Sequence, residues 1–80
     1  MDELKQVKRL YSFRGYFEYY FEIFPKYNRG LAAYEAIERE FYELFGANRY
    51  ADYAVFRKMK RKYILVIQAE SRQRRKILRR

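Results

Sequence analysis

The chain has no cysteine, histidine or tryptophan, and only one proline and three glycines in 80 residues. The lack of cysteine excludes a disulfide framework, a thiolate nucleophile and a cysteine-based zinc site. The lack of histidine removes the commonest general base and metal ligand. At this length we expect one small domain with a modest core.

Long apolar runs are missing as well. The longest aliphatic run is residues 64–67, and a membrane span needs roughly 20 apolar residues. The segment from Met1 to Lys5 has no apolar stretch typical of a secretory signal. We therefore expect a cytoplasmic protein.

The charge is concentrated at one end of the chain. Residues 1–56 carry eight basic and nine acidic side chains, whereas residues 57–80 carry eleven basic side chains and one acid, Glu70. This asymmetry predicts an anionic partner, such as nucleic acid, an acidic protein or an anionic membrane surface. The alternative is a solvated segment that keeps the protein soluble.

Aromatic residues supply most of the bulk for a core. Ten tyrosines and seven phenylalanines make up 21% of the chain. Each ring buries roughly 150–250 Å², which compensates for the missing disulfides and metal. Because the rings recur mostly at helical spacing, we interpret them as core residues rather than as a platform for stacked bases.

The first predicted helix runs from Asp2 to Phe24, with apolar residues at three- and four-residue steps. Gly15 marks a possible kink or break. Pro25 is expected to end this helix, and residues 26–30 to form a linker. Residues 17–23 also alternate in a manner compatible with a strand.

The second predicted helix covers residues 31–45, with Asn28 as a candidate N-cap and Gly46 as the C′ residue. Its expected apolar face consists of Tyr34, Ile37, Phe41, Leu44 and Phe45. Its expected solvated acidic face includes Glu35, Glu38, Glu40 and Glu43.

The third predicted helix begins after Asp52, a good N-cap, and continues to about Arg80. Its apolar side is expected to contain Phe56, Met59, Tyr63 and Ile67. Residues 63–68 are also compatible with a short strand. Residues 71–80 have six basic residues and no acid, a composition that favours fraying when the protein is free.

Catalytic constellations are not found. Ser12 and Ser71 have no histidine to activate them. The carboxylates of the second helix lack the histidines and additional helices that usually complete a metal site in a bundle. The glycines are isolated, so no phosphate-binding loop is present. We predict a non-enzymatic protein without a cofactor or metal.

The strongest positive pattern is a helix, a glycine-containing turn and a basic helix. In a helix-turn-helix unit the second helix enters the DNA major groove. Phe56, Met59 and Tyr63 would anchor that helix, and Arg57 and Arg61 would point outward. Arginine pairs bidentately with guanine, whereas lysine more often contacts phosphate.

The same region carries a resemblance. Its residues are Tyr34-x-x-Ile37-x-x-Glu40-Phe41-x-x-x-Phe45-Gly46-x-x-Arg49-Tyr50-x-Asp52-Tyr53-x-x-Phe56-Arg57. This run resembles small, mostly uncharacterised proteins of bacterial phages and mobile elements. It is also similar to the helix-turn-helix part of transposase-like and repressor-like proteins. The resemblance implies a phage- or mobile-element-encoded DNA-binding protein. We expect its role to be regulatory.

We therefore predict an all-α, three-helix bundle of helix-turn-helix type, with a domain at residues 1–70 and a basic C-terminal helical extension at 71–80. The predicted nucleic-acid-binding residues are Arg49, Tyr53, Arg57, Lys58, Arg61, Lys62, Arg72, Arg74, Arg75, Lys76, Arg79 and Arg80. DNA is favoured over RNA, and a homodimer is compatible with the pattern.

Three other partners remain open. The basic end would also suit an acidic protein bound by a small phage-type inhibitor or interaction module. An arginine-rich helix that folds on RNA would use the same residues. A membrane surface ranks last, because its anchors Ile64, Ile67, Ile77 and Leu78 flank a nearly empty apolar face.

Overall fold

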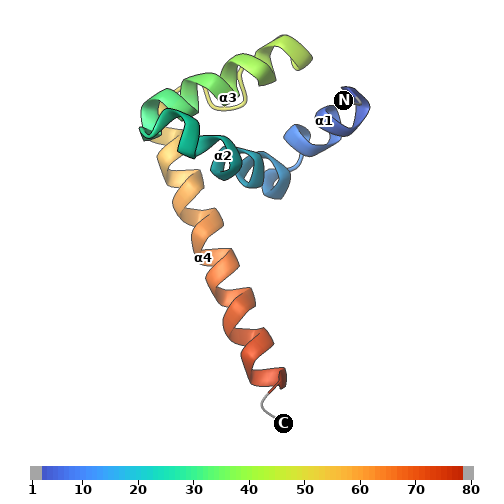
Figure 1. Ribbon diagram of the computed structural model, residues 1–80, viewed down its shortest axis with the longest axis vertical. Helices are drawn as coiled ribbons and strands as arrows, with labels where there is room; N and C mark the ends of the chain where they lie inside the picture. Colours follow the sequence, from blue (N-terminus) through green and yellow to red (C-terminus); the bar gives the residue numbers. More distant parts are fainter. Residues whose placement is uncertain (1–2, 79–80) are drawn as a thin grey trace.

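The computed structural model describes residues 3–78, and the side chains of residues 4–73. Its helices are α1 (Glu3–Tyr11), α2 (Phe13–Tyr27), α3 (Gly30–Phe45) and α4 (Tyr53–Leu78). The described residues contain no strand, so the all-α class is confirmed, and residues 17–23 and 63–68 are helical. In Figure 1, α1, α2, α3 and the start of α4 form a body from which the rest of α4 extends.

The first predicted helix is divided into α1 and α2, and the division falls at Ser12 rather than Gly15. The Ser12 hydroxyl accepts a hydrogen bond of 2.9 Å from the Gly15 backbone N–H and so caps α2. Gly15 itself has no room for a side chain, because a Cβ there would lie 2.2 Å from the Arg9 carbonyl oxygen. Gly15 thus permits the close approach of α2 to α1.

The expected end of the helix at Pro25 is wrong, since α2 continues through it to Tyr27. The helix ends where Asn28 adopts a left-handed conformation (φ 56°) and donates its N–H to the Phe24 carbonyl at 2.8 Å. Asn28 is therefore the C-cap of α2, not the N-cap of α3. That N-cap position belongs to Arg29, whose side chain makes no capping hydrogen bond.

The predicted boundaries between α3 and α4 are confirmed. Gly46 has a φ of 75°, in the left-handed region, and donates its N–H to the Tyr42 carbonyl at 2.7 Å. The Asp52 carboxylate accepts a hydrogen bond of 2.8 Å from the Ala54 N–H and caps the start of α4. The loop at residues 46–52 connects the two helices.

The core consists mainly of aromatic rings from α2, α3 and α4. Its buried members are Leu10, Tyr16, Phe17, Tyr20, Ala33, Tyr34, Ile37, Phe41 and Phe56. Phe56 has no exposed surface. The rings with centroids within 6.3 Å of it are those of Tyr16, Phe17, Tyr20, Tyr34, Tyr50 and Tyr53. The interpretation of the aromatics as core residues is confirmed for these positions.

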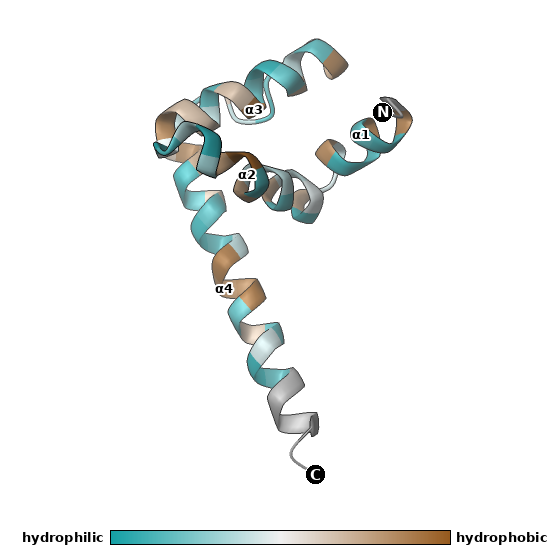
Figure 2. Ribbon diagram, viewed as in Figure 1, coloured by the Kyte–Doolittle hydropathy of each residue, from teal (hydrophilic) through white to brown (hydrophobic). Residues whose placement is uncertain are grey.

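The last part of α4, which we term the distal segment (residues 64–78), gives the molecule its elongated shape. The Cα radius of gyration is 14.4 Å, compared with about 12 Å for a compact chain of this length. Figure 2 shows that this segment mixes hydrophobic and hydrophilic residues along its described length. The Arg14 guanidinium of α2 pairs with the Glu70 carboxylate. The expected boundary at residue 70 lies within an uninterrupted helix.

Candidate nucleic-acid interface

The loop before α4 is held by a buried carboxylate, Glu38. The prediction that Glu38 lies on a solvated acidic face is wrong, because this residue is only 3% exposed. It accepts hydrogen bonds from the Tyr16 hydroxyl, the Asn48 amide at 3.1 Å and the Tyr50 backbone N–H at 3.2 Å. Burial and the hydrogen bond to Glu38 raise the pKa of Tyr16 well above its usual value.

A second hydrogen bond fixes the same loop from α3. The Tyr34 hydroxyl donates to the Tyr50 carbonyl oxygen. Together with the Asp52 cap, these contacts determine where α4 begins relative to α3. The direction in which α4 presents its side chains is therefore set by the folded body.

One side of α4 is anchored in the core. Phe56 is fully buried, and the Tyr63 ring stacks on Phe17 with centroids 5.4 Å apart. Because successive residues of a helix are turned by about 100°, some positions between these anchors face away from the body, whereas Met59 packs against the core. Arg57, Lys58 and Arg61 occupy the outward positions and are exposed.

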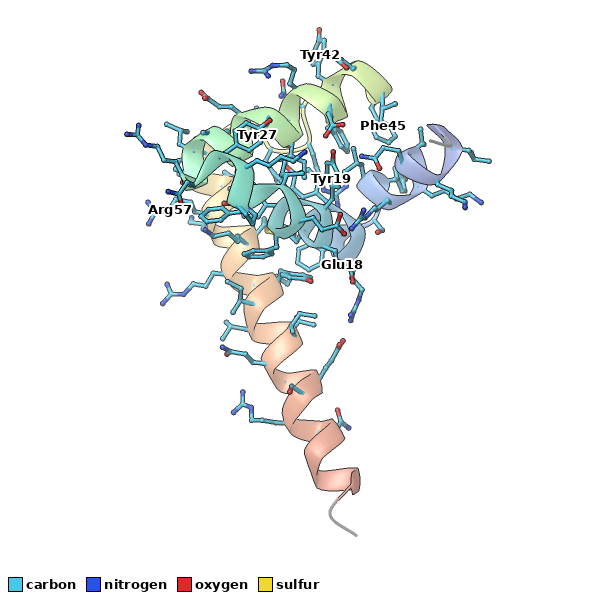
Figure 3. All side chains as sticks on the ribbon, viewed as in Figure 1. Glu18, Tyr19, Tyr27, Tyr42, Phe45 and Arg57 are labelled. Carbon is cyan, nitrogen blue, oxygen red and sulfur yellow. The ribbon has the colours of Figure 1, made fainter. Side chains whose placement is uncertain are left out.

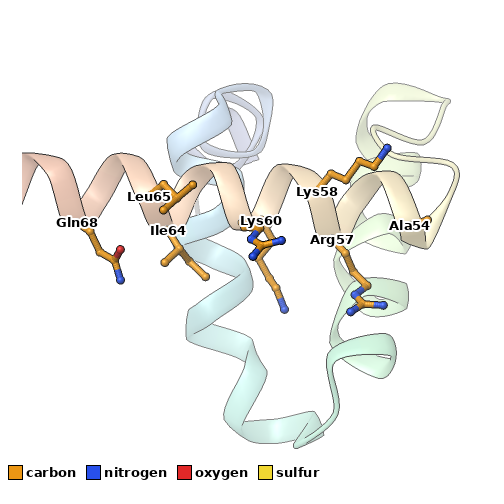
Figure 4. A pocket seen from close by; sticks show the side chains of 8 residues that line it. Ala54, Arg57, Lys58, Lys60, Ile64, Leu65 and Gln68 are labelled. Carbon is orange, nitrogen blue, oxygen red and sulfur yellow. The ribbon is translucent and has the colours of Figure 1, made fainter.

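These outward residues line an open groove of about 770 Å³. All of its lining residues belong to α4: Ala54, Arg57, Lys58, Lys60, Arg61, Ile64, Leu65 and Gln68. Figure 4 shows the labelled side chains following one side of the helix. In Figure 3 the Arg57 side chain lies at the edge of the body. We refer to this surface as the α4 groove.

Three of the predicted binding residues, Arg57, Lys58 and Arg61, come together in the α4 groove. Lys62 and Arg72 are exposed on the same helix outside the groove lining. The side chains of Arg74, Arg75, Lys76, Arg79 and Arg80 lie outside the part of the chain whose side chains the structure describes.

Two predicted residues are engaged in the body instead. The Arg49 guanidinium donates to the Tyr11 carbonyl at 2.7 Å and to the Tyr50 hydroxyl at 3.2 Å. The Tyr53 ring stacks on Phe56, with an interplanar angle of 15°. These contacts separate both residues from the α4 groove, although the Arg57 guanidinium lies 6.0 Å from the Tyr53 ring centroid.

Sequence reasoning missed four lining residues: Ala54, Lys60, Leu65 and Gln68. The sequence indicates Ile64 only as a membrane anchor. Positions 57, 61, 64, 65 and 68 share one helical face, so helical spacing indicates this set, whereas charge indicates only its basic members. Lys60 borders the core, with its ammonium 5.7 Å from the Tyr20 ring centroid.

Other kinds of site find no support within the described residues. No group of three or more acidic side chains there is arranged to hold a metal ion. None of the described helices is both long and apolar enough to cross a membrane. No protein-family model matches this chain, and no curated protein or solved structure matches it significantly.

Proposed function

We propose that this protein binds double-stranded DNA through the α4 groove and acts as a regulatory DNA-binding protein without catalysis. The observation that carries the proposal is that Arg57, Lys58 and Arg61 line one exposed groove on a helix anchored from its opposite side. The acid of this helix, Glu70, pairs with Arg14 of α2. The groove is thus suited to a polyanion.

In this proposal, α3, the loop at 46–52 and α4 serve as a helix-turn-helix unit, with α4 in the major groove. The loop exceeds the turn of about three or four residues found in the tightest units. Arg57 and Arg61 would contact guanine edges, and Lys58 phosphates. The basic residues from Arg72 onward would act as an extension on the DNA backbone, adding affinity without sequence information.

The proposal distinguishes DNA from RNA on geometric grounds. The major groove of B-DNA admits an α-helix, whereas that of A-form RNA is deep and narrow. A helix that inserts along its length, as α4 would, is therefore expected to bind duplex DNA more tightly than duplex RNA.

The test is fluorescence anisotropy with labelled duplex DNA, duplex RNA and single strands over a salt series. We expect the R57A/R61A double variant to bind duplex DNA at least tenfold more weakly. The slope of log affinity against log salt should fall by up to about 2 if both arginines also neutralise phosphates. Thermal stability should be unchanged, because both side chains are exposed.

The matched control is K26A/R39A, which removes the same charge from exposed positions on α2 and α3. It should retain nearly full DNA affinity. Equal losses for the two double variants, or competition by polyglutamate as strong as that by DNA, would refute a DNA-specific groove and favour an acidic protein partner.

A further inference from the structure

Two aliphatic side chains lie exposed inside the basic groove. Leu65 is 55% exposed and Ile64 is 37% exposed. Both line the α4 groove, one turn after Arg61 and one turn before Gln68. Phe56, Met59 and Tyr63 occupy the core-facing positions of this helix, so packing among the side chains that the structure describes does not explain the aliphatic pair.

The surroundings of this pair indicate what covers it. Along the same helical face, Arg57 and Arg61 precede it and Arg72 follows it. A second copy packed on this face would bring like charges together. A polyanion that also presents apolar groups can contact both the basic residues and the aliphatic pair. The major groove of duplex DNA has this character, because each thymine presents a C5 methyl group there.

Gln68 adds a polar contact of the matching kind. It lies three residues after Leu65 and four after Ile64, on the same face (Figure 4). A glutamine amide pairs bidentately with N6 and N7 of adenine. An aliphatic pair beside a glutamine therefore has the chemistry to recognise both bases of an A·T pair.

We propose that Ile64, Leu65 and Gln68 read A·T base pairs in the major groove, with the aliphatic groups on thymine methyls and the Gln68 amide on adenine. This inference rests on the proposed function. A helix rises about 1.5 Å per residue, so Arg57 and Gln68 are about 16 Å apart along α4. At about 3.4 Å per base pair, the contacts from Arg57 to Gln68 would together span at most about five base pairs.

The test removes the thymine methyl groups alone. The probes are two labelled 24-base-pair duplexes of one sequence, an A·T tract flanked by G·C pairs, made with thymidine or with deoxyuridine. Wild-type protein should prefer the thymidine duplex by about fourfold for each methyl group buried. I64A/L65A should bind both duplexes equally.

Val66→Ala is the matched control, because Val66 is an exposed aliphatic residue (39%) of the same helix that does not line the groove. It should keep the wild-type preference. A second arm uses 7-deazaadenine, which lacks the N7 acceptor: wild type should bind this duplex more weakly, and Gln68→Ala should be indifferent to the change.

Other outcomes separate the two proposals. Tight duplex binding by wild type without a thymidine preference would overturn this inference and leave DNA binding standing. Failure to bind any duplex at physiological salt would overturn both. Sedimentation should show the same species for wild type and I64A/L65A, since a dimer lost in the variant would assign the aliphatic pair to self-association instead.

Discussion

The body and the distal segment of α4 belong to one chain but differ in what holds them together. The body is packed from aromatic rings on different helices, whereas residues 64–78 contain no aromatic residue. In Figures 1 and 3 the distal segment extends away from the other helices. Its Glu70 carboxylate pairs with Arg14 of α2.

This difference shows that the two parts of α4 are stabilised differently, the start by contacts with the body and the distal segment by continuing a helix that has already formed. An isolated helix must form a costly first turn before it can grow. The start of α4 is already folded by the Asp52 cap and the burial of Phe56. The distal segment extends a helix that has already begun, so it does not have to form a first turn of its own.

The largest expected effect comes from the centre of the body. Phe56→Ala should cost about 3–5 kcal/mol of unfolding free energy, because the ring is fully buried among other rings. Urea unfolding followed by circular dichroism measures this cost. Leu65→Ala in the distal segment is the comparison, and a similar cost there would show that the segment also belongs to the core.

The next effect tests the buried polar contacts of the body. Glu38→Ala leaves the Tyr16 hydroxyl, the Asn48 amide and the Tyr50 N–H without their acceptor. We expect a loss of about 1–3 kcal/mol from the buried Tyr16 hydroxyl and smaller losses from the two part-buried donors, with faster amide exchange in the loop at 46–52. Glu35→Ala, on the exposed side of α3, is the control and should change neither quantity.

High pH should lower the stability of the folded body, because tyrosines are buried in its core. Burial raises the pKa of Tyr16, Tyr20, Tyr34 and Tyr63 in the folded protein. The unfolded chain loses these protons near pH 10, so the stabilisation is complete below that pH and is lost as pH rises above it. The melting temperature should fall between pH 9 and pH 11.

Tyr20→Phe sharpens the pH experiment. The Tyr20 hydroxyl is buried and has no hydrogen-bond partner among the described residues, so its removal should not destabilise the protein at neutral pH. The variant should lose less stability than wild type at pH 11. A melting temperature independent of pH in wild type would contradict the role assigned to burial.

The smallest effect concerns the contact between the two regions. Arg14→Ala removes the ion pair with Glu70. Both side chains of this pair are about half exposed, so its loss should lower the free energy of unfolding by less than about 1 kcal/mol. Amide exchange in residues 64–73 should nevertheless become faster. Arg72→Ala, which leaves this ion pair intact, is the control. Equal exchange in the two variants would show that the Arg14–Glu70 ion pair does not hold the distal segment against the body.

The helix ends that are set by residues close in sequence could be predicted from the sequence. Gly46 and Asp52 marked the end of α3 and the start of α4, because left-handed glycine and carboxylate capping act within one turn. Ser12 has the same kind of local signal as the N-cap of α2, whereas Gly15 lies inside that helix. Pro25 gave a wrong helix end, because α2 continues for about one more turn to the C-cap at Asn28.

The remaining errors involve residues whose surroundings come from distant parts of the chain. Glu38 has the spacing of an exposed acid and becomes buried because Tyr16 and Tyr50 supply its donors. Arg49 resembles a DNA-binding arginine, yet the Tyr11 carbonyl lies within reach of its guanidinium. Composition alone contains no information on such pairings, whereas the basic face of α4 follows from helical spacing.

The unbroken course of α4 has a consequence for how the chain can vary in length. Phe56 and Tyr63 fix the rotation of α4 about its own axis. Because the helix is continuous, this rotation determines the direction in which every later residue points. Deleting one residue after Tyr63 would turn Gln68 by about 100° about the axis, away from the groove that now contains it. A change of seven residues, nearly two full turns, would preserve the angle to within about 20°. The number of residues between the core anchors and the α4 groove therefore determines the groove as much as the identities of its residues do.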